Sequence, residues 1–162
     1  MLKRALPLAA LFIALDQATK LFVQRTFELH ESRVVILGFF DFCHVVNLGA
    51  SWGIFHGHRW PLSAFAVLAL VLLVVFRKHI LPPAQPFSAT TLALLLGGIA
   101  GNLIDRVRIG GVIDFLHVHW RHTYNFPVFN IADTCISVGL VLYIIGQILA
   151  ERDARKNMKD EG

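Results

Sequence analysis

The segment from Gly110 to Asp133, GGVIDFLHVHWRHTYNFPVFNIAD, holds the residues whose types and spacing most readily suggest chemistry. It has an aspartate near each end, Asp114 in VIDF and Asp133 in NIAD. Two carboxylates brought close together cannot both ionise cheaply, so such a pair holds one proton between them. The ionised member can activate a water while the protonated member polarises a carbonyl, which is aspartic-protease chemistry. We therefore predict that Asp114 and Asp133 form the working pair of an enzyme that needs no cofactor and no catalytic metal.

Two other chemistries stay open as alternatives. The histidines of HGH (residues 56–58) and HVHWRH (residues 117–122) have spacings that could hold zinc, although no HExxH is present. Ser51 in NLGASWGIF is a possible nucleophile, but the sequence has no GxSxG and no evident His–Asp partner for it. We assign no role to the histidine-rich segment.

The composition indicates a membrane protein. The 162 residues suit one domain, and 56% are hydrophobic while only 16% are charged. A soluble domain carries about 25% charged residues. The net charge of +4 does not indicate a nucleic-acid partner, because the basic residues are not gathered into a patch with aromatics. We expect one integral membrane domain covering residues 1–162.

Four apolar segments are near the ~20 residues that a helix needs to cross a bilayer. They are residues 5–23, 61–76, 88–104 and 131–150, which leaves two longer loops at 24–60 and 105–130. The first segment could be a signal peptide, but Asp16, Gln17 and Lys20 follow with no small-x-small cleavage site. We therefore expect four transmembrane helices, the first one retained.

The distribution of lysine and arginine predicts the orientation. Basic residues are densest at both termini and in the short loop after the second segment, which places those parts in the cytoplasm. Both long loops would then lie outside. The segment from Arg33 to Asn47, RVVILGFFDFCHVVN, predicts short strands. The expected fold class is an all-α membrane protein of four helices, N-in and C-in, with a small β-rich cradle on the first outer loop.

This topology brings several polar residues to the outer leaflet. Asp16 and Lys20 are four residues apart and can pair on one helix face. The glycines of GGIAGNLIDR (residues 97–106) allow helices to approach closely. Ionisable residues inside spans are expensive and indicate function. The residues that converge at one depth are Asp16, Asn102, Asp105, Asp114, Asn130 and Asp133.

Each of these acids also has a structural explanation. Asp16 and Lys20 could be a packing ion pair, and Asp105 could pair with Arg106. Asp133 could be a first-turn acid that the helix dipole favours. Their convergence at one depth is what favours a functional site.

Five motifs in this order resemble the lipoprotein signal peptidase family, also called signal peptidase II, the bacterial membrane aspartic peptidases. They are DQATK (16–20), NLGASWGIF (47–55), GGIAGNLIDR (97–106), GGVIDF (110–115) and FNIAD (129–133). The resemblance covers almost the whole chain.

The resemblance implies a function and a set of residue roles. Such enzymes cleave diacylglyceryl prolipoproteins on the amino side of the lipidated cysteine, in the bacterial inner membrane among its lipids, and globomycin inhibits them. Asp114 and Asp133 match the catalytic aspartates, and residues 33–46 match the surface strands that cradle the substrate. The expected supporting residues are Asp16, Lys20, Asn47, Asn102, Asp105, Arg106, Asn130 and Ala132.

Two functions of other classes remain as alternatives. A proton-coupled transporter or channel would use the acids as a relay, but a relay should spread its acids across the bilayer, and four spans are few for a transporter. A non-catalytic assembly protein would use GGIAG to dimerise.

Overall fold

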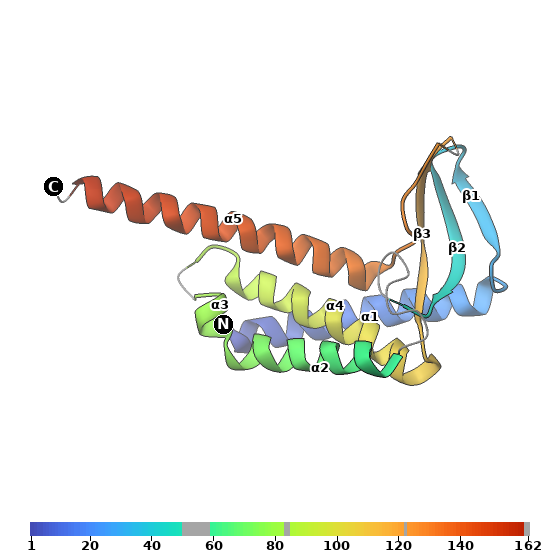
Figure 1. Ribbon diagram of the computed structural model, residues 1–162, viewed down its shortest axis with the longest axis horizontal. Helices are drawn as coiled ribbons and strands as arrows, with labels where there is room; N and C mark the ends of the chain where they lie inside the picture. Colours follow the sequence, from blue (N-terminus) through green and yellow to red (C-terminus); the bar gives the residue numbers. More distant parts are fainter. Residues whose placement is uncertain (50–58, 83–84, 122, 161–162) are drawn as a thin grey trace.

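The computed structural model describes residues 1–49, 59–82, 85–121 and 123–160. Long helices lie side by side, and a four-stranded antiparallel sheet stands at one end of them (Figure 1). Both chain termini lie at the end of the molecule away from the sheet (Figure 1). The sheet end holds the strands of both long loops and, as shown below, most of the buried polar residues.

Each of the four predicted apolar segments forms a helix. These helices are α1 (Leu2–Thr26), α2 (Arg59–Val75), α4 (Ser88–Ile109) and α5 (Ile131–Asp160), with a short α3 (Arg77–Ile80) after α2. Within the described residues, α1 and the part of α5 up to Asn157 are long and apolar enough to cross a membrane, and α2 is a shorter apolar helix.

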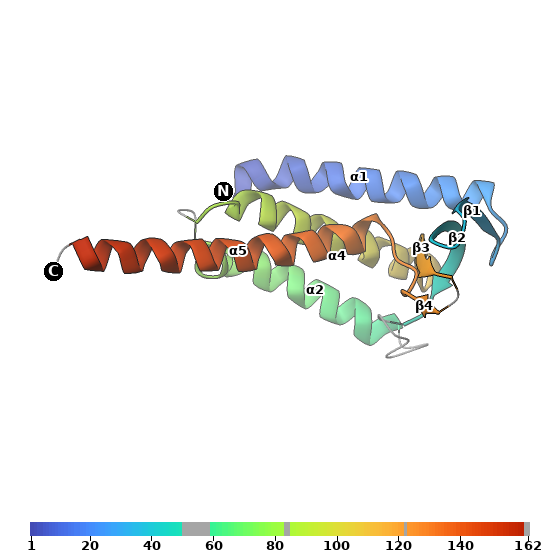
Figure 2. The same ribbon diagram turned by 90° about the horizontal axis from the view of Figure 1, so that it is seen from above.

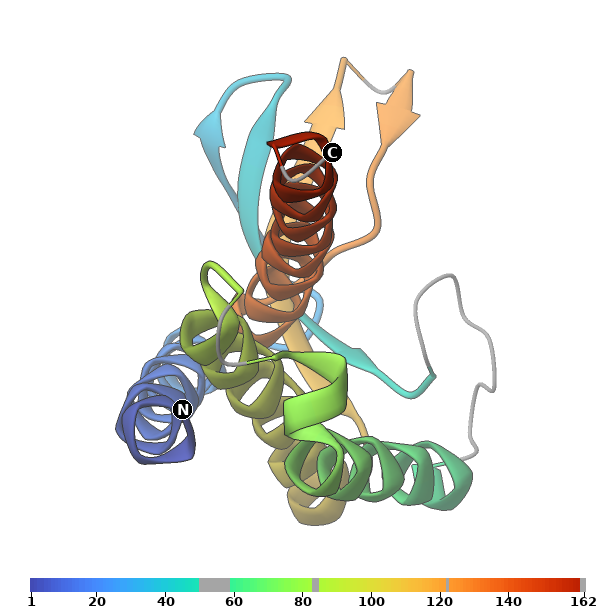
Figure 3. The same ribbon diagram turned by 90° about the vertical axis from the view of Figure 1, so that its left-hand side faces the viewer.

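Helix α4 lies at the centre of the bundle and packs against α1, α2 and α5 (Figures 2 and 3). Two glycines allow this close packing. A Cβ on Gly98 would collide with the carbonyl oxygen of Ala132 on α5, and a Cβ on Gly101 would lie 2.6 Å from an Asp16 carboxylate oxygen on α1. The predicted close approach of helices at GGIAG is confirmed.

The outer faces of the peripheral helices are strongly apolar. Exposed leucine, valine, isoleucine and phenylalanine side chains run along α1, α2 and α5, for example Leu11, Phe22, Phe65, Leu68, Val71, Val141, Ile144 and Ile148. Continuous exposed apolar surface on this scale indicates contact with a membrane rather than with water.

The sheet is formed by β1 (Ser32–Ile36), β2 (Phe40–Asn47), β3 (Val112–Trp120) and β4 (Tyr124–Asn125), in that order. The strands predicted in the first long loop are confirmed as β1 and β2. The expectation that the sheet belongs to this loop alone was wrong, because β3 and β4 come from the second loop.

Strand β3 forms because its residues suit a sheet and a partner strand is available. VIDFLHVHW is rich in β-branched and aromatic residues. It completes the open edge of β2, with Val45 opposite Asp114 and Asp41 opposite His117. Ile113 and Phe115 are buried against Val23, which attaches the sheet to the end of α1. Asp114 therefore lies on a strand rather than on a loop.

Candidate active site

Asp133 is fixed by the start of helix α5. The side chain of Asn130, the residue before the helix, accepts a hydrogen bond from the Asp133 backbone N–H at 2.9 Å. The Asp133 carboxylate accepts one from the Asn130 backbone N–H at 3.2 Å. This reciprocal pair is a capping box with an aspartate in the third helical position. The first-turn role considered for Asp133 is thus present, and it holds the carboxylate in a defined place.

Asp114 is fixed by the β2–β3 ladder. It is 2% exposed and receives hydrogen bonds from two side-chain amides. The Asn47 amide nitrogen, at the end of β2, donates at 3.1 Å, and that of Asn130 donates at 2.7 Å. The pairing of Asn47 with Val112 places the Asn47 side chain beside the carboxylate.

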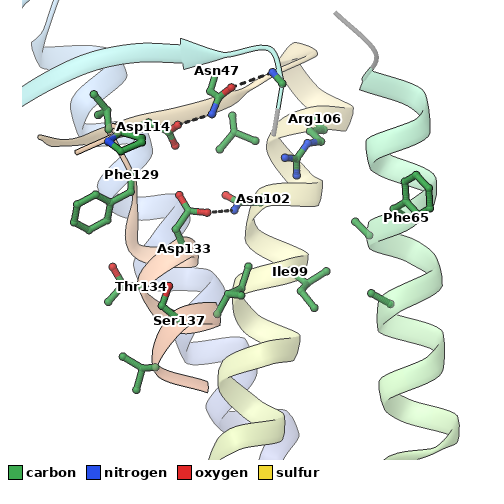
Figure 4. A pocket seen from close by; sticks show the side chains of 18 of the residues that line it. Asn47, Phe65, Ile99, Asn102, Arg106, Asp114, Phe129, Asp133, Thr134 and Ser137 are labelled. Atoms are coloured by element: carbon green, nitrogen blue, oxygen red, sulfur yellow. Dashed lines mark hydrogen bonds between the residues drawn. The ribbon is translucent and has the colours of Figure 1, made fainter. Parts of the chain in front are cut away.

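A bridge of two asparagine amides joins the two aspartates. Asn102 on α4 donates to Asp133 at 2.8 Å, and its side-chain oxygen accepts from Asn130 at 3.1 Å. Asn130 also donates to Asp114, so a continuous hydrogen-bonded path runs between the carboxylates. Figure 4 shows both acids facing the same space.

That space is a cavity of about 700 Å³ between α2, α4 and α5. The charged and amide side chains of its described lining are those of Asp114, Asp133, Asn47, Asn102 and Arg106. The remainder is largely apolar and includes Phe65, Ala66, Ala69, Ile99, Val112, Phe126, Val128, Phe129, Ile136 and Val138. A small polar group at one place in an apolar cavity is the usual form of a site for a small molecule or a chain segment.

Burial and, to a smaller extent, the negative charge of Asp133 raise the pKa of Asp114 from 3.8 to about 7. Hydrogen bonds from Asn47 and Asn130 and the charge of Lys20 oppose this change in pKa. A carboxyl that titrates near neutral pH can carry a proton or release one at little cost, which suits acid–base chemistry.

Behind the two aspartates lies a fully buried lysine. The Lys20 ammonium pairs with Asp16 at 2.9 Å and with Asp105 at 3.0 Å, and it donates to the Asn102 side-chain oxygen at 2.9 Å. The predicted Asp16–Lys20 pair is confirmed. Because an ammonium only donates, the Asn102 oxygen must face Lys20 and the amide nitrogen must face Asp133. Lys20 therefore sets the orientation of the amide that holds Asp133.

The remaining predicted residues lie in the same region but contribute differently. Ala132 acts through its backbone N–H, which donates to Asp16 at 2.9 Å. Arg106 lines the cavity. The alternative pairing of Asp105 with Arg106 is wrong, since in the described part of the chain the ion pairs of Asp105 are with Lys20 and, at 3.6 Å, with Arg108.

Sequence reasoning missed Gln17 as a member of this cluster. Its amide nitrogen lies 3.2 Å from carboxylate oxygens of Asp16 and Asp105 and from the Gly101 carbonyl oxygen. The signal was its place within DQATK, a polar residue in an apolar helix. Ser51, the histidines of HGH and His122 lie outside the described residues. The structure therefore does not test the serine nucleophile or a zinc site that uses these histidines.

The fold and the cavity together are those of a membrane enzyme. The structure is similar to a solved bacterial membrane enzyme, with a TM-score of 0.81 and 32% identity over 92% of this chain and 90% of that one. A second solved bacterial membrane enzyme matches with a TM-score of 0.74 and 34% identity over 87% of this chain and 90% of that one.

Sequence comparisons identify the family. The family model for signal peptidase (SPase) II matches residues 8–149. The lipoprotein signal peptidase of Geobacter sulfurreducens is 43% identical over 86% of this chain and 88% of its own length. That of Geobacter metallireducens is 40% identical over 93% and 92%. The chain belongs to the signal peptidase II family, the peptidases that remove signal peptides from prolipoproteins.

Proposed function

We propose that Asp114 and Asp133 are the catalytic dyad of a membrane aspartic endopeptidase. Its substrate is a diacylglyceryl prolipoprotein, cut on the amino side of the lipidated cysteine. The observation that carries this proposal is the joining of two carboxylates, buried Asp114 on β3 and partly buried Asp133 on α5, through the amides of Asn102 and Asn130 at one wall of the cavity.

The dyad would hydrolyse the peptide bond with a single shared proton. The ionised carboxylate takes a proton from water as the water oxygen attacks the scissile carbonyl carbon. The protonated carboxyl gives its proton to the carbonyl oxygen, which forms a neutral tetrahedral gem-diol. Collapse of this intermediate breaks the C–N bond, one carboxyl protonates the leaving amine, and the other recovers the proton from the gem-diol.

The supporting residues hold the two carboxyl groups in place with one proton between them. Amide donors from Asn47, Asn102 and Asn130 stabilise the charged form of each acid without adding a cation. Lys20, with Asp16 and Asp105, fixes the Asn102 amide from behind. Arg106 extends from α4 into the cavity (Figure 4). There its guanidinium would donate hydrogen bonds to the backbone carbonyl groups of the substrate.

The apolar part of the cavity supports a lipidated substrate. Residues of α2 and α5 face each other across it, including Phe65, Ala69, Ile136 and Val138. A signal-peptide helix and acyl chains would bury apolar surface there, while the scissile bond lies beside the two acids. The globomycin-type inhibitor implied by the family resemblance would occupy the same space.

We further propose a multi-pass position in the bacterial inner membrane, with four spans and the sheet at the outer leaflet. The two termini and the short loop after α2, which hold most of the basic residues, would lie in the cytoplasm. The apolar outer faces of α1, α2 and α5 support contact with lipid. The concentration of the described buried acids at the sheet end supports an enzyme over a proton relay through the bilayer.

Cleavage of a diacylglyceryl prolipoprotein by the purified protein tests the dyad. Asp114→Asn and Asp133→Asn should each lower turnover by at least about 10³-fold, because an amide can neither accept the water proton nor supply one. Mass spectrometry of the product should place the cut directly before the lipidated cysteine.

Asp153→Asn, which changes an exposed carboxylate further along α5, is the matched control and should cleave like the wild type. If either dyad variant, folded as judged by its thermal transition, kept near wild-type turnover, the assignment of the dyad would be wrong.

A further inference from the structure

A second group of ligating side chains lies on the sheet, away from the cavity. Asp41 on β2 is directly opposite His117 on β3, and His119 follows two residues later on the same strand face. The His119 Nε2 atom lies 3.2 Å from an Asp41 carboxylate oxygen, and the His117 Nδ1 atom lies 3.8 Å from the same oxygen. The two imidazole rings are stacked with their centres 4.9 Å apart.

These separations are close to those of a metal site. One ligand atom from each residue can be chosen so that all three lie within 4.8 Å of one another. Ligands of a tetrahedral zinc at 2.0–2.1 Å from the ion are about 3.3 Å apart. The His119–Asp41 pair already has this spacing, and small side-chain rotations would bring His117 in.

The chemistry of Asp41 also indicates a ligand. Its second carboxylate oxygen, Oδ1, is buried and accepts no hydrogen bond in the described part of the structure. A buried carboxylate oxygen without a partner is costly, and a bound cation removes that cost. The side chains of His117 and Asp41 are 26% and 14% exposed, so an ion can enter from solvent.

The group is separate from the proposed dyad. Along β3, Val112 and Asp114 face the cavity, whereas Ile113 and Phe115 face α1. Since side chains alternate along a strand, His117 and His119 share the face of Ile113 and Phe115. An irregularity of β2 between Phe42 and Val45 further separates Asp41 from the Asn47 end.

We propose that Asp41, His117 and His119 form a binding site for one divalent transition-metal ion of the zinc type. Two imidazoles and a carboxylate are the ligands such ions prefer, and a water would complete the tetrahedron. The ion would link β2 to β3 near the hairpin that joins β1 and β2. It would therefore stabilise the ladder whose other end holds Asn47 beside Asp114, without reaching the reacting bond.

The test is metal binding by the full-length protein, purified in detergent and stripped with a chelator. Equilibrium dialysis against zinc, followed by metal analysis, should give one tightly bound ion per chain. Cobalt in place of zinc should give the intense visible absorption of a tetrahedral site. Zinc should also raise the Tm of the wild type.

Three variants assign the site. Asp41→Asn keeps the side-chain shape but removes the charge, and His117→Asn and His119→Asn each remove an imidazole. Each should weaken zinc binding by about 100-fold or more. Changing a residue that only hydrogen-bonds to a metal ligand already weakens metal binding by up to about 100-fold, and these variants change the ligands themselves. His79→Asn, an exposed histidine on α3, is the control and should bind zinc like the wild type.

Two results would overturn the proposal. One is a wild-type chain that takes up no zinc at micromolar concentrations. The other is tight binding that survives in Asp41→Asn and in the histidine variants. Zinc uptake by the wild type is measured independently of the variants, so a variant that misfolds does not protect the proposal from the first of these results.

Discussion

Two pairs of carboxylates lie next to each other at the sheet end of the bundle, all buried except the partly buried Asp133, and the two pairs have different kinds of partner. Asp16 and Asp105 share the ammonium of Lys20 at 2.9 and 3.0 Å. Asp114 and Asp133 receive hydrogen bonds from amides, those of Asn47, Asn102 and Asn130 and the Asn130 backbone. The first pair contacts a cation directly, whereas the hydrogen bonds of the second pair come from amide dipoles.

This difference separates a structural pair from a reactive pair. We call Asp16 and Asp105 with Lys20 the compensated layer, and Asp114 and Asp133 the reactive layer. A carboxylate paired with a buried ammonium stays charged, and it serves to fix its neighbours. A buried carboxylate beside a second acid has a raised pKa that amide hydrogen bonds only partly offset, and that of Asp114 is about 7. Asn102 joins the two layers, because it accepts from Lys20 and donates to Asp133. The compensated layer can thus position the reactive one without neutralising it.

Removing the cation should cause the largest loss of stability. Lys20→Met leaves Asp16 and Asp105 buried without their shared partner, and breaking such a buried pair costs about 5 kcal/mol. We expect the Tm of the purified protein to fall by about 10–20 °C, measured by thermal unfolding in detergent.

Lys78→Met, which changes an exposed lysine on α3, is the control and should unfold like the wild type. The double variant Lys20→Met with Asp105→Asn should recover part of the loss, since it has one orphaned charge fewer. A Lys20→Met protein as stable as the wild type would show that Lys20 does not stabilise the compensated layer.

The second prediction concerns the pH dependence of stability. The folded protein keeps the Asp114 proton up to a pKa of about 7, whereas the unfolded chain releases it near its ordinary value of 3.8. Between these values the folded state binds more protons at Asp114, so the contribution of Asp114 to stability falls as pH rises and is constant outside that window. The difference corresponds to about 4 kcal/mol.

Asp114→Asn cannot ionise and should lack this fall. Its Tm relative to the wild type should therefore be higher at pH 8 than at pH 4, as followed by thermal unfolding across that range. Asp153→Asn should keep the wild-type curve. Parallel curves for the wild type and Asp114→Asn would mean that Asp114 is not held in a state that resists ionisation.

Much of this arrangement could be predicted from the sequence because membranes restrict backbone structure. Apolar length predicted the four helices, and spacing predicted that Asp16 would meet Lys20 and that Asn130 and Asp133 would lie together. The glycines of GGIAG predicted the close contacts of α4. These inferences depend on neighbours along one helix or on composition, which a sequence shows directly.

The rest depended on pairing between distant segments. Strand β3 was not foreseen, because a strand near 112–120 is stable only when β2 offers it an edge. Without that register nothing indicated that Asn47 would donate to Asp114 or that Asp41 would lie opposite His117. Gln17 was missed for a similar reason, since its partners Gly101 and Asp105 are on another helix.

The smallest predicted effect tests whether amides tune the reactive layer. Asn47 donates to Asp114 at 3.1 Å and so lowers its pKa. Removing a hydrogen bond to a charged group changes an equilibrium by about 1.5 kcal/mol, which corresponds to about one pH unit. Asn47→Ala should move the alkaline limb of the pH profile of kcat/KM to higher pH by that amount.

Asn47 also accepts a hydrogen bond from the Gly49 backbone, so the alanine variant changes the turn as well. Asn47→Asp keeps that acceptor but replaces the amide donor with a second negative charge beside Asp114. It should move the alkaline limb further in the same direction, which a mere change of the turn would not do. Asn157→Ala, on the exposed end of α5, should leave the profile unchanged. If neither Asn47 variant moved the limb, the difference between the two carboxylate layers would come from burial alone and not from the amides.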